Sequence, residues 1–269
     1  MWDASATLPA GGREWLPAMD VPEPGRQSRL TVFFRMLLLI PQFIVFWLLS
    51  IVAFVVAVLG WFGALFTGRL PEFAAGFLSG YVAYGVRLES YLMLLVDSYP
   101  PFRFDAPEHP VRTEVRPGEL NRLAVFFRLV LVIPAAIIQG VLMSGWWAVG
   151  FISWLVVLVL GRMPRPLFEA TAAITRYRFR YQAYFLMLSS AYPKGLFGED
   201  ALDTVPGSGP VSATRPLVMG SSGRALLVVF IILGIVAYGA SSITTSVNSD
   251  SDGDDGYARH AGVTAPAVP

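Results

Sequence analysis

The sequence contains no cysteine and little charge. Without cysteine among its 269 residues, disulfides, thiolate metal sites and cysteine nucleophiles are excluded. Charged residues make up only 14% of the chain and hydrophobic residues 55%, which is about half the charge fraction of an average soluble domain. The two histidines, His109 and His260, lie in polar segments without a second ligand-type residue at helical spacing. Water therefore cannot be the only solvent of this chain, and we expect no metal and no cofactor.

Motifs that carry catalysis are also missing. The sequence has no Gly-rich phosphate loop, no G-x-S-x-G and no acidic pair within an apolar run. The acidic cluster at residues 250–255 lacks the closing Glu of a calcium loop, so a solvated tail is the better interpretation. Lys194 is the single lysine beside nineteen arginines, a ratio that codon bias in a GC-rich bacterial genome produces. We therefore expect a bacterial protein that is not an enzyme and has no nucleic-acid partner.

The chain does contain a tandem repeat. Residues 24–100 align without a gap with residues 117–193, at an offset of 93, and 25 of the 77 aligned positions are identical. The identities cluster in short motifs, while the apolar residues between them vary. Such self-similarity indicates a duplicated structural unit.

The shared motifs resemble those of a known family. R-L-x-V-F-F-R at residues 29–35 recurs at 122–128, and G-R-x-P at residues 68–71 recurs at 161–164. A proline, a tryptophan and a Tyr/Arg segment closing on Tyr-Pro stand at matching positions in both copies. This arrangement resembles two tandem copies of an uncharacterised bacterial integral membrane domain, catalogued as domain of unknown function 4389. The resemblance implies a membrane location and supplies no catalytic residues.

Two long uncharged runs, residues 36–66 and 129–160, are the predicted membrane-embedded segments. Each exceeds the roughly 20 residues that one helical span needs. As one straight helix, such a run would be about 46 Å long, against a hydrocarbon core of about 30 Å. We therefore expect a helical hairpin with its turn near Ser50 in the first run and near Ser144 and Gly145 in the second, and one long tilted span is the alternative.

Charge placement favours the hairpin. Arginines flank both ends of both runs, and cytoplasmic segments carry the excess of Lys and Arg in membrane proteins. Both ends of each run are therefore predicted to lie in the cytoplasm, which requires an even number of crossings. The expected fold is all-α: a multi-pass integral membrane protein of the cell inner (plasma) membrane.

The later part of each repeat, residues 73–98 and 167–191, is predicted to be an interfacial amphipathic helix. Three arginines within residues 176–180 would make a central span costly, at about 2.5 to 3.5 kcal/mol each. Tyr and Arg side chains recur at i, i+3 and i+7 in both copies, which places each trio on one helical stripe. The trios are Tyr84, Arg87 and Tyr91 in the first copy and Tyr177, Arg180 and Tyr184 in the second.

The remaining segments complete the expected organisation. An alternating stretch at residues 111–116 predicts a short extended arm between the repeats. The uncharged stretch 225–243 predicts one membrane helix, with Arg224 inside and the acidic tail outside. The predicted units are a polar segment (1–23), repeat 1 (24–103), a linker (104–116), repeat 2 (117–194), a flexible linker (195–223), a C-terminal transmembrane helix (224–245) and a disordered acidic tail (246–269).

Arg35 and Arg128 are the strongest single candidates for a binding role, because each follows two Phe and enters an apolar run. They could bind lipid phosphate at the membrane face, or they could be anchoring arginines beside an aromatic belt, which we favour. Together with the two Tyr/Arg trios they form the predicted lipid- or partner-binding set.

The sequence leads to two hypotheses about function. The first is a non-enzymatic scaffold or accessory subunit that contacts anionic lipid or a membrane protein partner. The second is a small-solute channel or transporter built from the two repeats, for which the only polar candidates within the runs are Gln42, Ser50, Gln139 and Ser144. A lipid-modifying enzyme comes third, because no nucleophile or metal site is identifiable. The oligomeric state stays open.

Overall fold

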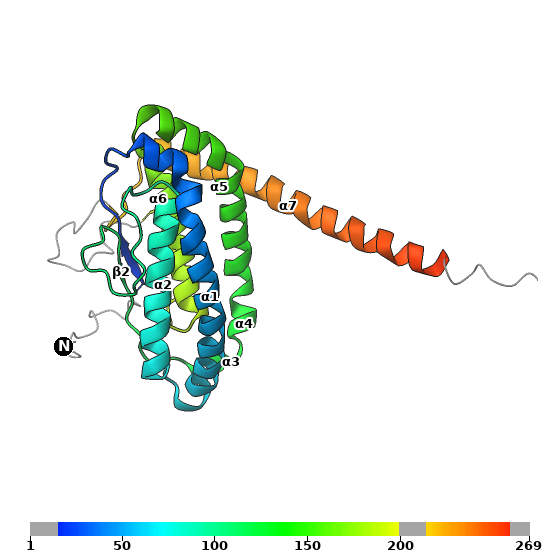
Figure 1. Ribbon diagram of the computed structural model, residues 1–269. Coiled ribbons are helices and arrows are strands. Elements are labelled where there is room, and N and C mark those ends of the chain that lie inside the picture. The colour runs from blue at the N-terminus through cyan, green and yellow to red at the C-terminus, as the bar shows by residue number, and fades with distance from the viewer. Residues whose placement is uncertain (1–15, 199–213, 259–269) are drawn as a thin grey trace, which may run out of the picture.

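The computed structural model describes residues 16–198 and 214–258, with side chains up to residue 240. Within these ranges the chain is mostly helical with little strand, and Figure 1 shows the arrangement. The elements in chain order are β1 Ala18–Asp20, α1 Arg29–Thr67, α2 Glu72–Leu92, β2 Arg112–Glu114, α3 Arg122–Phe126, α4 Arg128–Leu131, α5 Ile133–Leu160, α6 Arg165–Phe185 and α7 Ser221–Ala258.

The first apolar run forms one continuous helix, so the predicted hairpin is wrong there. Helix α1 has 39 residues and contains Pro41 without interruption. At the expected turn, the Ser50 hydroxyl donates to the carbonyl of Trp47 in the same helix. The helix ends at Gly68, whose φ of 76° places it in the left-handed region that glycine adopts without strain. A serine within an apolar run is therefore no turn signal when its hydroxyl can bond back to its own helix.

The second run contains no hairpin either, but it is interrupted near its start. The interruptions lie at Phe127 and Val132, which separate α3, α4 and α5. Pro134 stands in the first turn of α5, where its missing N–H leaves no hydrogen bond unmade. Ser144 and Gly145, the expected turn, are both inside α5. Gly161 ends α5 with a φ of 65°, as Gly68 ends α1.

The two repeats pack head to tail and exchange equivalent contacts. The Trp61 indole donates to the carbonyl of Val125 at 3.0 Å, and the equivalent Trp154 donates to the carbonyl of Val32 at 2.8 Å. Each pair joins the end of one long helix to the beginning of the other. The repeats are therefore related by an approximate twofold axis that runs across the helices, so equivalent ends of the two repeats lie at opposite ends of the bundle.

Backbone hydrogen bonds between the repeats also occur in equivalent pairs. Gln27 N–H donates to the carbonyl of Gly161, and the equivalent Leu120 N–H donates to the carbonyl of Gly68, both at 2.8 Å. Antiparallel backbone bridges adjoin both bonds, between Arg26 and Arg162 and between residues 69 and 119. The motifs R-L-x-V-F-F-R and G-R-x-P thus meet across the repeats at both ends of the bundle.

The helices and loops form three layers. In Figure 1 the long helices α1 and α5 lie on one side, α2 lies beside α1, and the loops with β2 lie on the other side of α2. β1 pairs with β2 in an antiparallel two-stranded sheet that contacts α2 and α6. β2 confirms the predicted extended arm at 111–116, although its partner near the N-terminus was not predicted.

Helices α2 and α6 form the middle layer and are largely covered by protein, whereas their predicted place at the membrane interface stays a prediction. Fifteen of the 21 residues of α6 are buried, and the helix contacts α2, α5, α7 and β1. In α2, the face with Tyr84 contacts α1, and Gly80 packs against Phe104 of the loop layer. The arginines that make α6 too polar to cross a membrane alone are instead enclosed by protein.

Helix α7 docks on the second repeat through two glycines. A Cβ added to Gly145 of α5 would overlap the carbonyl of Phe230, and one added to Gly234 of α7 would overlap the carbonyl of Val141. The backbones therefore approach more closely than any other residue type permits. In Figure 1, α7 leaves the bundle beside α5 and points away from the loop layer, across the direction of α1.

The backbone of α7 continues to Ala258, beyond the predicted end at residue 245. The predicted disorder of residues 246–269 stays a prediction. Residues 259–269 lie outside the described residues, as do residues 1–15 of the predicted polar segment and 199–213 of the predicted flexible linker.

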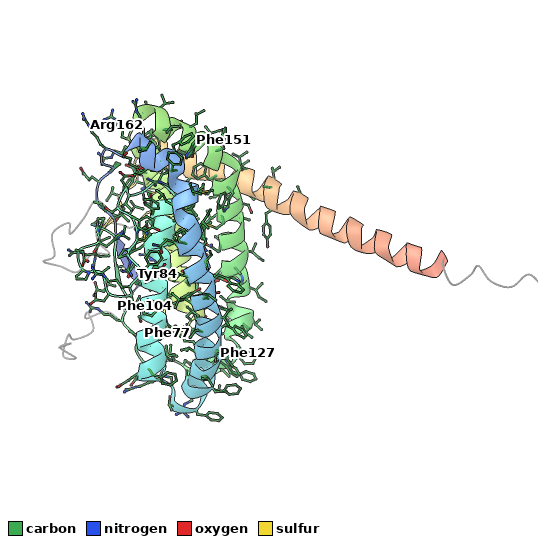
Figure 2. All side chains as sticks on the ribbon, viewed as in Figure 1. Phe77, Tyr84, Phe104, Phe127, Phe151 and Arg162 are labelled. Atoms are coloured by element: carbon green, nitrogen blue, oxygen red, sulfur yellow. The ribbon has the colours of Figure 1, made fainter. Side chains whose placement is uncertain are left out.

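Three helical segments are long and apolar enough to cross a membrane: Arg29–Thr67, Arg128–Leu160 and Ser221–Ala240. The first two carry most of the large apolar side chains that the structure leaves exposed, and Figure 2 shows Phe151 of the second segment and Phe127, which directly precedes it. An exposed apolar surface of this extent is typical of a membrane protein.

Candidate functional site

Arg35 is buried and caps the C-terminal end of α2. Its guanidinium donates to the carbonyls of Tyr91 and Val96, and it lies 4.3 Å from the centre of the Tyr91 ring. It also donates to the side chains of Gln27 at 3.0 Å and Asp97 at 3.1 Å. A cation at a helix C-terminus satisfies carbonyls that have no partner within the helix and opposes the negative end of the helix dipole.

Arg128 does the same for α6 in the second repeat. Its Nε donates to the carbonyl of Tyr184 at 2.7 Å, and its Nη2 donates to the carbonyl of Ser189 at 2.6 Å. The guanidinium lies 4.1 Å from the centre of the Tyr184 ring. Each carbonyl partner stands 93 residues after its counterpart around Arg35, but the two side-chain partners are not repeated, because Leu120 replaces Gln27 and Ser190 replaces Asp97. The Arg/Tyr pairs are thus a duplicated helix cap.

The other two members of the first trio also bond within the protein. The Tyr84 hydroxyl donates to Gln42 of α1, and Arg87 donates to the carbonyls of Arg103 at 2.7 Å and Phe104 at 2.8 Å. Figure 2 shows Tyr84 and Phe104 on the side of the bundle that carries the loops. Arg87 therefore fastens the loop layer to α2.

The second trio is less symmetric. Arg180 donates to the carbonyl of Lys194 at 2.7 Å and to the carbonyl of Pro17 at 3.2 Å, so it holds the chain before β1. The hydroxyl of Tyr177 is buried without a hydrogen-bond partner among the described residues, and burial raises the pKa of Tyr177 to about 12. Tyr184 lies under Arg128, as described above.

All eight predicted binding residues are thus buried: Arg35, Arg128, Tyr84, Arg87, Tyr91, Tyr177, Arg180 and Tyr184. The structure brings them together only in pairs, at the C-terminal ends of α2 and α6 and against the loops. Their guanidinium groups donate to main-chain carbonyls, which is a role in holding the fold. A lipid-binding role for these residues stays a prediction.

Four other arginines, not singled out from the sequence, gather at the ends of the long helices. Arg29 passes Gly161 and donates to the carbonyl of Val159 at 3.0 Å. The antiparallel bridge at Arg26 brings Arg162 to the same end, which Figure 2 shows at the extreme of the bundle. All three side chains are exposed. We call Arg29 and Arg162 the first arginine corner.

The twofold relation produces a second arginine corner, Arg69 and Arg122, at the opposite end of α1. Arg122 passes Gly68, and Arg69 forms an exposed ion pair with Glu119. Each corner combines one arginine from R-L-x-V-F-F-R of one repeat with one from G-R-x-P of the other. The identical residues in both copies were a signal for this site, but only the antiparallel packing shows which arginines meet.

A buried ion pair joins the middle helices and was also missed. Glu89 of α2 contacts Arg178 of α6 at 3.1 Å, and the second carboxylate oxygen of Glu89 has no partner among the described residues. Burial raises the pKa of Glu89 to about 7, although Arg178 opposes the shift. The equivalent residues in the other copies are Gln182 and Gly85, so no repeated motif pointed to this pair.

The polar residues proposed for a solute pathway do not gather on one face. Gln42 is buried and bonded to Pro100 and Tyr84, and Ser50 bonds within its own helix. Gln139 has a buried side-chain oxygen without a partner among the described residues. The transport hypothesis therefore gains no support from a shared polar lining.

Within the described part of the chain, no group of three or more His, Asp or Glu could hold a metal ion. A surface hollow near the start of α7 is lined by Arg165, Glu169 and Gly220. The Glu169 carboxylate there accepts from both of the other two, at 3.1 Å and 2.8 Å, so its charge already serves to join α6 to the start of α7.

Comparison with known proteins agrees with the duplicated geometry. Neither curated proteins nor solved structures yield a match to this chain. The family described as domain of unknown function DUF4389 matches residues 29–103 and again residues 122–196, together more than half of the chain. The chain belongs to the DUF4389 family, of which it carries two tandem copies.

Proposed function

We propose that this protein is a non-enzymatic scaffold or accessory subunit of a bacterial inner membrane that holds anionic lipid headgroups at its two arginine corners. The observation that carries the proposal is the placement of exposed arginines at both ends of an exposed apolar surface. Arginine donates two parallel hydrogen bonds to a phosphate, and cytoplasmic leaflets carry anionic lipid.

The arginine corners suit this role better than Arg35 and Arg128 do. Arg35 and Arg128 are buried, and their guanidinium groups donate to carbonyls inside the protein. The corner arginines are exposed and lie near exposed phenylalanines and leucines of the same helices, although Arg29 also donates to the carbonyl of Val159. A headgroup bound at a corner would place its acyl chains along the apolar helices. The twofold relation puts Arg26 beside the first corner and Glu119 beside the second, where Glu119 pairs with Arg69, so an anionic headgroup should bind more tightly at the first corner.

The same charges support a finer placement of the chain. With positive residues at both ends of both long helices, the loops of the repeats are assigned to the cytoplasm and the acidic C-terminal tail to the outside. The loop layer, with its exposed charges, then remains available to a membrane protein partner from the cytoplasmic side.

Native mass spectrometry of the gently extracted protein tests the lipid proposal. Each basic residue near a charged surface contributes about 1 kcal/mol, so Arg29→Ala with Arg162→Ala should weaken retention of phosphatidylglycerol or cardiolipin by about 2 kcal/mol, or roughly 30-fold. The double variant Arg69→Ala with Arg122→Ala should act in the same direction but more weakly, because Glu119 already pairs with Arg69.

The matched control is Arg103→Ala with Arg112→Ala, two exposed arginines of the loop layer. This control should retain lipid as the wild type does. Equal retention by all three double variants would contradict the proposal, and so would equal retention of a zwitterionic lipid in place of the anionic one.

A further inference from the structure

An orientation across the bilayer is unfavourable for the two long helices, both because of their length and because of the charged loops beside them. The uncharged part of α1, residues 36–66, is about 46 Å long at 1.5 Å per residue, against about 30 Å of hydrocarbon. A strong tilt would be required to bury it. Length alone therefore disfavours a perpendicular orientation.

The loop layer makes the perpendicular orientation costlier still. The middle of α2 lies beside the middle of α1, where Gly85 packs against Phe46. On its other face, the middle of α2 is covered by the loop that contains Arg103 and Phe104. Arg103 and Glu108 of that loop are 55% and 60% exposed. If α1 stood along the bilayer normal, these charges would lie at the depth of the hydrocarbon, where each is expensive.

The charges at the ends of α1 independently disfavour an orientation of this helix along the bilayer normal. An arginine corner lies at each end of the helix, and positive residues stay on the cytoplasmic side. A single continuous helix cannot cross the membrane and have both ends on one side. Lying in the plane of the membrane, it satisfies that charge rule without the hairpin that the structure excludes.

Helix α7 supplies the direction of the bilayer normal. It runs across the direction of α1 and away from the loop layer (Figure 1), and its first 20 residues are apolar enough for one crossing. The glycine contacts at Gly145 and Gly234 fix it to α5, so α7 and the layers of the bundle share one orientation.

We propose that the tandem repeats form a slab lying in the cytoplasmic leaflet, with α1 and the first half of α5 embedded parallel to the membrane plane, and that α7 alone crosses the bilayer. The occupant of the exposed face of α1 is the acyl chains of that leaflet. The α2 and α6 layer then lies at headgroup depth, and the loop layer lies in water.

A second copy of α7 fits the free face of α1 poorly. By the twofold relation, Trp47 and Val52 of α1 stand where Gly140 and Gly145 stand on α5. Their side chains are 63% and 46% exposed and would block the close approach that α7 makes on the second repeat. Flexible acyl chains tolerate such a surface, whereas a closely packed helix does not.

Depth measurements with spin labels test this orientation, and the absence of native cysteine makes them clean. Leu37→Cys, Leu48→Cys and Leu59→Cys lie on one exposed stripe of α1, spaced by eleven residues. The protein is reconstituted into vesicles of phosphatidylcholine and phosphatidylglycerol, and depth is read from the relative accessibility of each label to oxygen and to a water-soluble nickel chelate.

The slab predicts nearly equal depth at the three α1 positions. Labels at Val229→Cys, Ile232→Cys and Val236→Cys of α7 should instead differ in depth, because these positions span about 10 Å along a crossing helix whose midpoint lies near residue 230. A deep label at Leu48 with shallow labels at Leu37 and Leu59 would overturn the proposal, as would labels on α1 that stay exposed to water.

Labelling from one side of the membrane gives a second reading. Arg69→Cys and Arg162→Cys stand at opposite ends of the bundle, and an impermeant maleimide should reach both from the cytoplasmic side only. Reaction from opposite sides would show that α1 crosses, and would overturn the slab. Neither experiment depends on the headgroup that the arginine corners prefer, so failure here is distinct from failure of the lipid proposal.

Discussion

The two copies of the repeat share their contacts but differ in their neighbours. In the first copy α1 is continuous and its apolar face has no protein partner among the described residues, whereas in the second copy α5 carries α7. The residues responsible are small: glycines at 140 and 145 stand where Trp47 and Val52 stand in the first copy. The motifs common to both copies hold the repeats together, and the positions that vary decide what else each copy binds.

The middle helices differ in a second respect. The first copy contributes a carboxylate, Glu89, and the second contributes its partner, Arg178, so the ion pair exists once across the twofold axis. The symmetric positions hold Gln182 and Gly85, which cannot form a second pair. This ion pair needs one residue from each copy. Two first copies packed together, or two second copies, would therefore lack it.

The largest change in stability is expected at the contact between α5 and α7, which only the second copy makes. Gly145→Val places a side chain against the carbonyl of Phe230, so it should separate α7 from α5 and destabilise the fold by about 3 kcal/mol, at the upper end for overpacking. Gly150→Val in the same helix is the matched control, because an added Cβ there meets Trp146 only at ordinary contact distance. Thermal unfolding in nanodiscs measures both, and equal melting temperatures would show that the glycine contact does not hold α7.

Loss of the capping arginine should lower the stability of the fold more in the first copy than in the second. Arg35→Ala removes four hydrogen bonds and leaves Asp97 without its cation, at a cost of about 3 to 5 kcal/mol, whereas Arg128→Ala removes two and should cost about 2 kcal/mol. Arg112→Ala, an exposed control, should change stability by less than about 0.5 kcal/mol. Denaturant unfolding gives the three values, and a smaller cost at Arg35 than at Arg128 would refute the cap argument.

A smaller effect should appear in the pH dependence of stability. Because burial raises the pKa of Glu89 to about 7 in the folded protein, the folded state binds more protons than the unfolded state between pH 4.5 and 7. Stability from this group is therefore present at low pH and is lost as the pH rises through 7. Glu89→Gln, which gives α2 the residue of the other copy, should remove that loss.

His109 acts in the opposite direction, because burial lowers the pKa of its imidazole and charging it at low pH destabilises the fold. Comparing wild type with Glu89→Gln at each pH cancels that contribution. The groups facing Glu89 are Arg178 and, beside that arginine, Tyr81 and Tyr181. Parallel pH profiles for the two proteins would show that Glu89 stays charged.

Much of the fold could be predicted from the sequence because its signals are local. The repeat, the apolar runs, the C-terminal helix and the extended arm at β2 follow from composition and periodicity. Gly68 and Gly161, the first residues of the shared G-R-x-P motifs, end α1 and α5. The hairpin was wrong because the expected turn residues Ser50 and Ser144 lie inside helices. In the proposed slab, a helix in the membrane plane carries the same charges at both ends and needs no turn.

The candidate site was harder to predict because it depends on packing between copies. Arg35 and Arg128 were interpreted as anchoring arginines or, less favoured, as lipid ligands, because nothing in the local sequence shows that the helix ends at Tyr91 and Tyr184 need a cation. Their recurrence at the same offset was the available clue. Glu89 offered none, because its partner lies 89 residues away in the other copy.

Disulfide trapping tests the head-to-tail packing most directly. The backbone bridges join residue 26 to 162 and residue 69 to 119, within the Cα separation that a disulfide accepts. The account predicts efficient cross-links in Arg26→Cys with Arg162→Cys and in Arg69→Cys with Glu119→Cys, and none in Arg26→Cys with Glu119→Cys. A cross-link in that last pair, which joins equivalent positions as parallel copies would, together with none in the first two, would contradict the inverted arrangement.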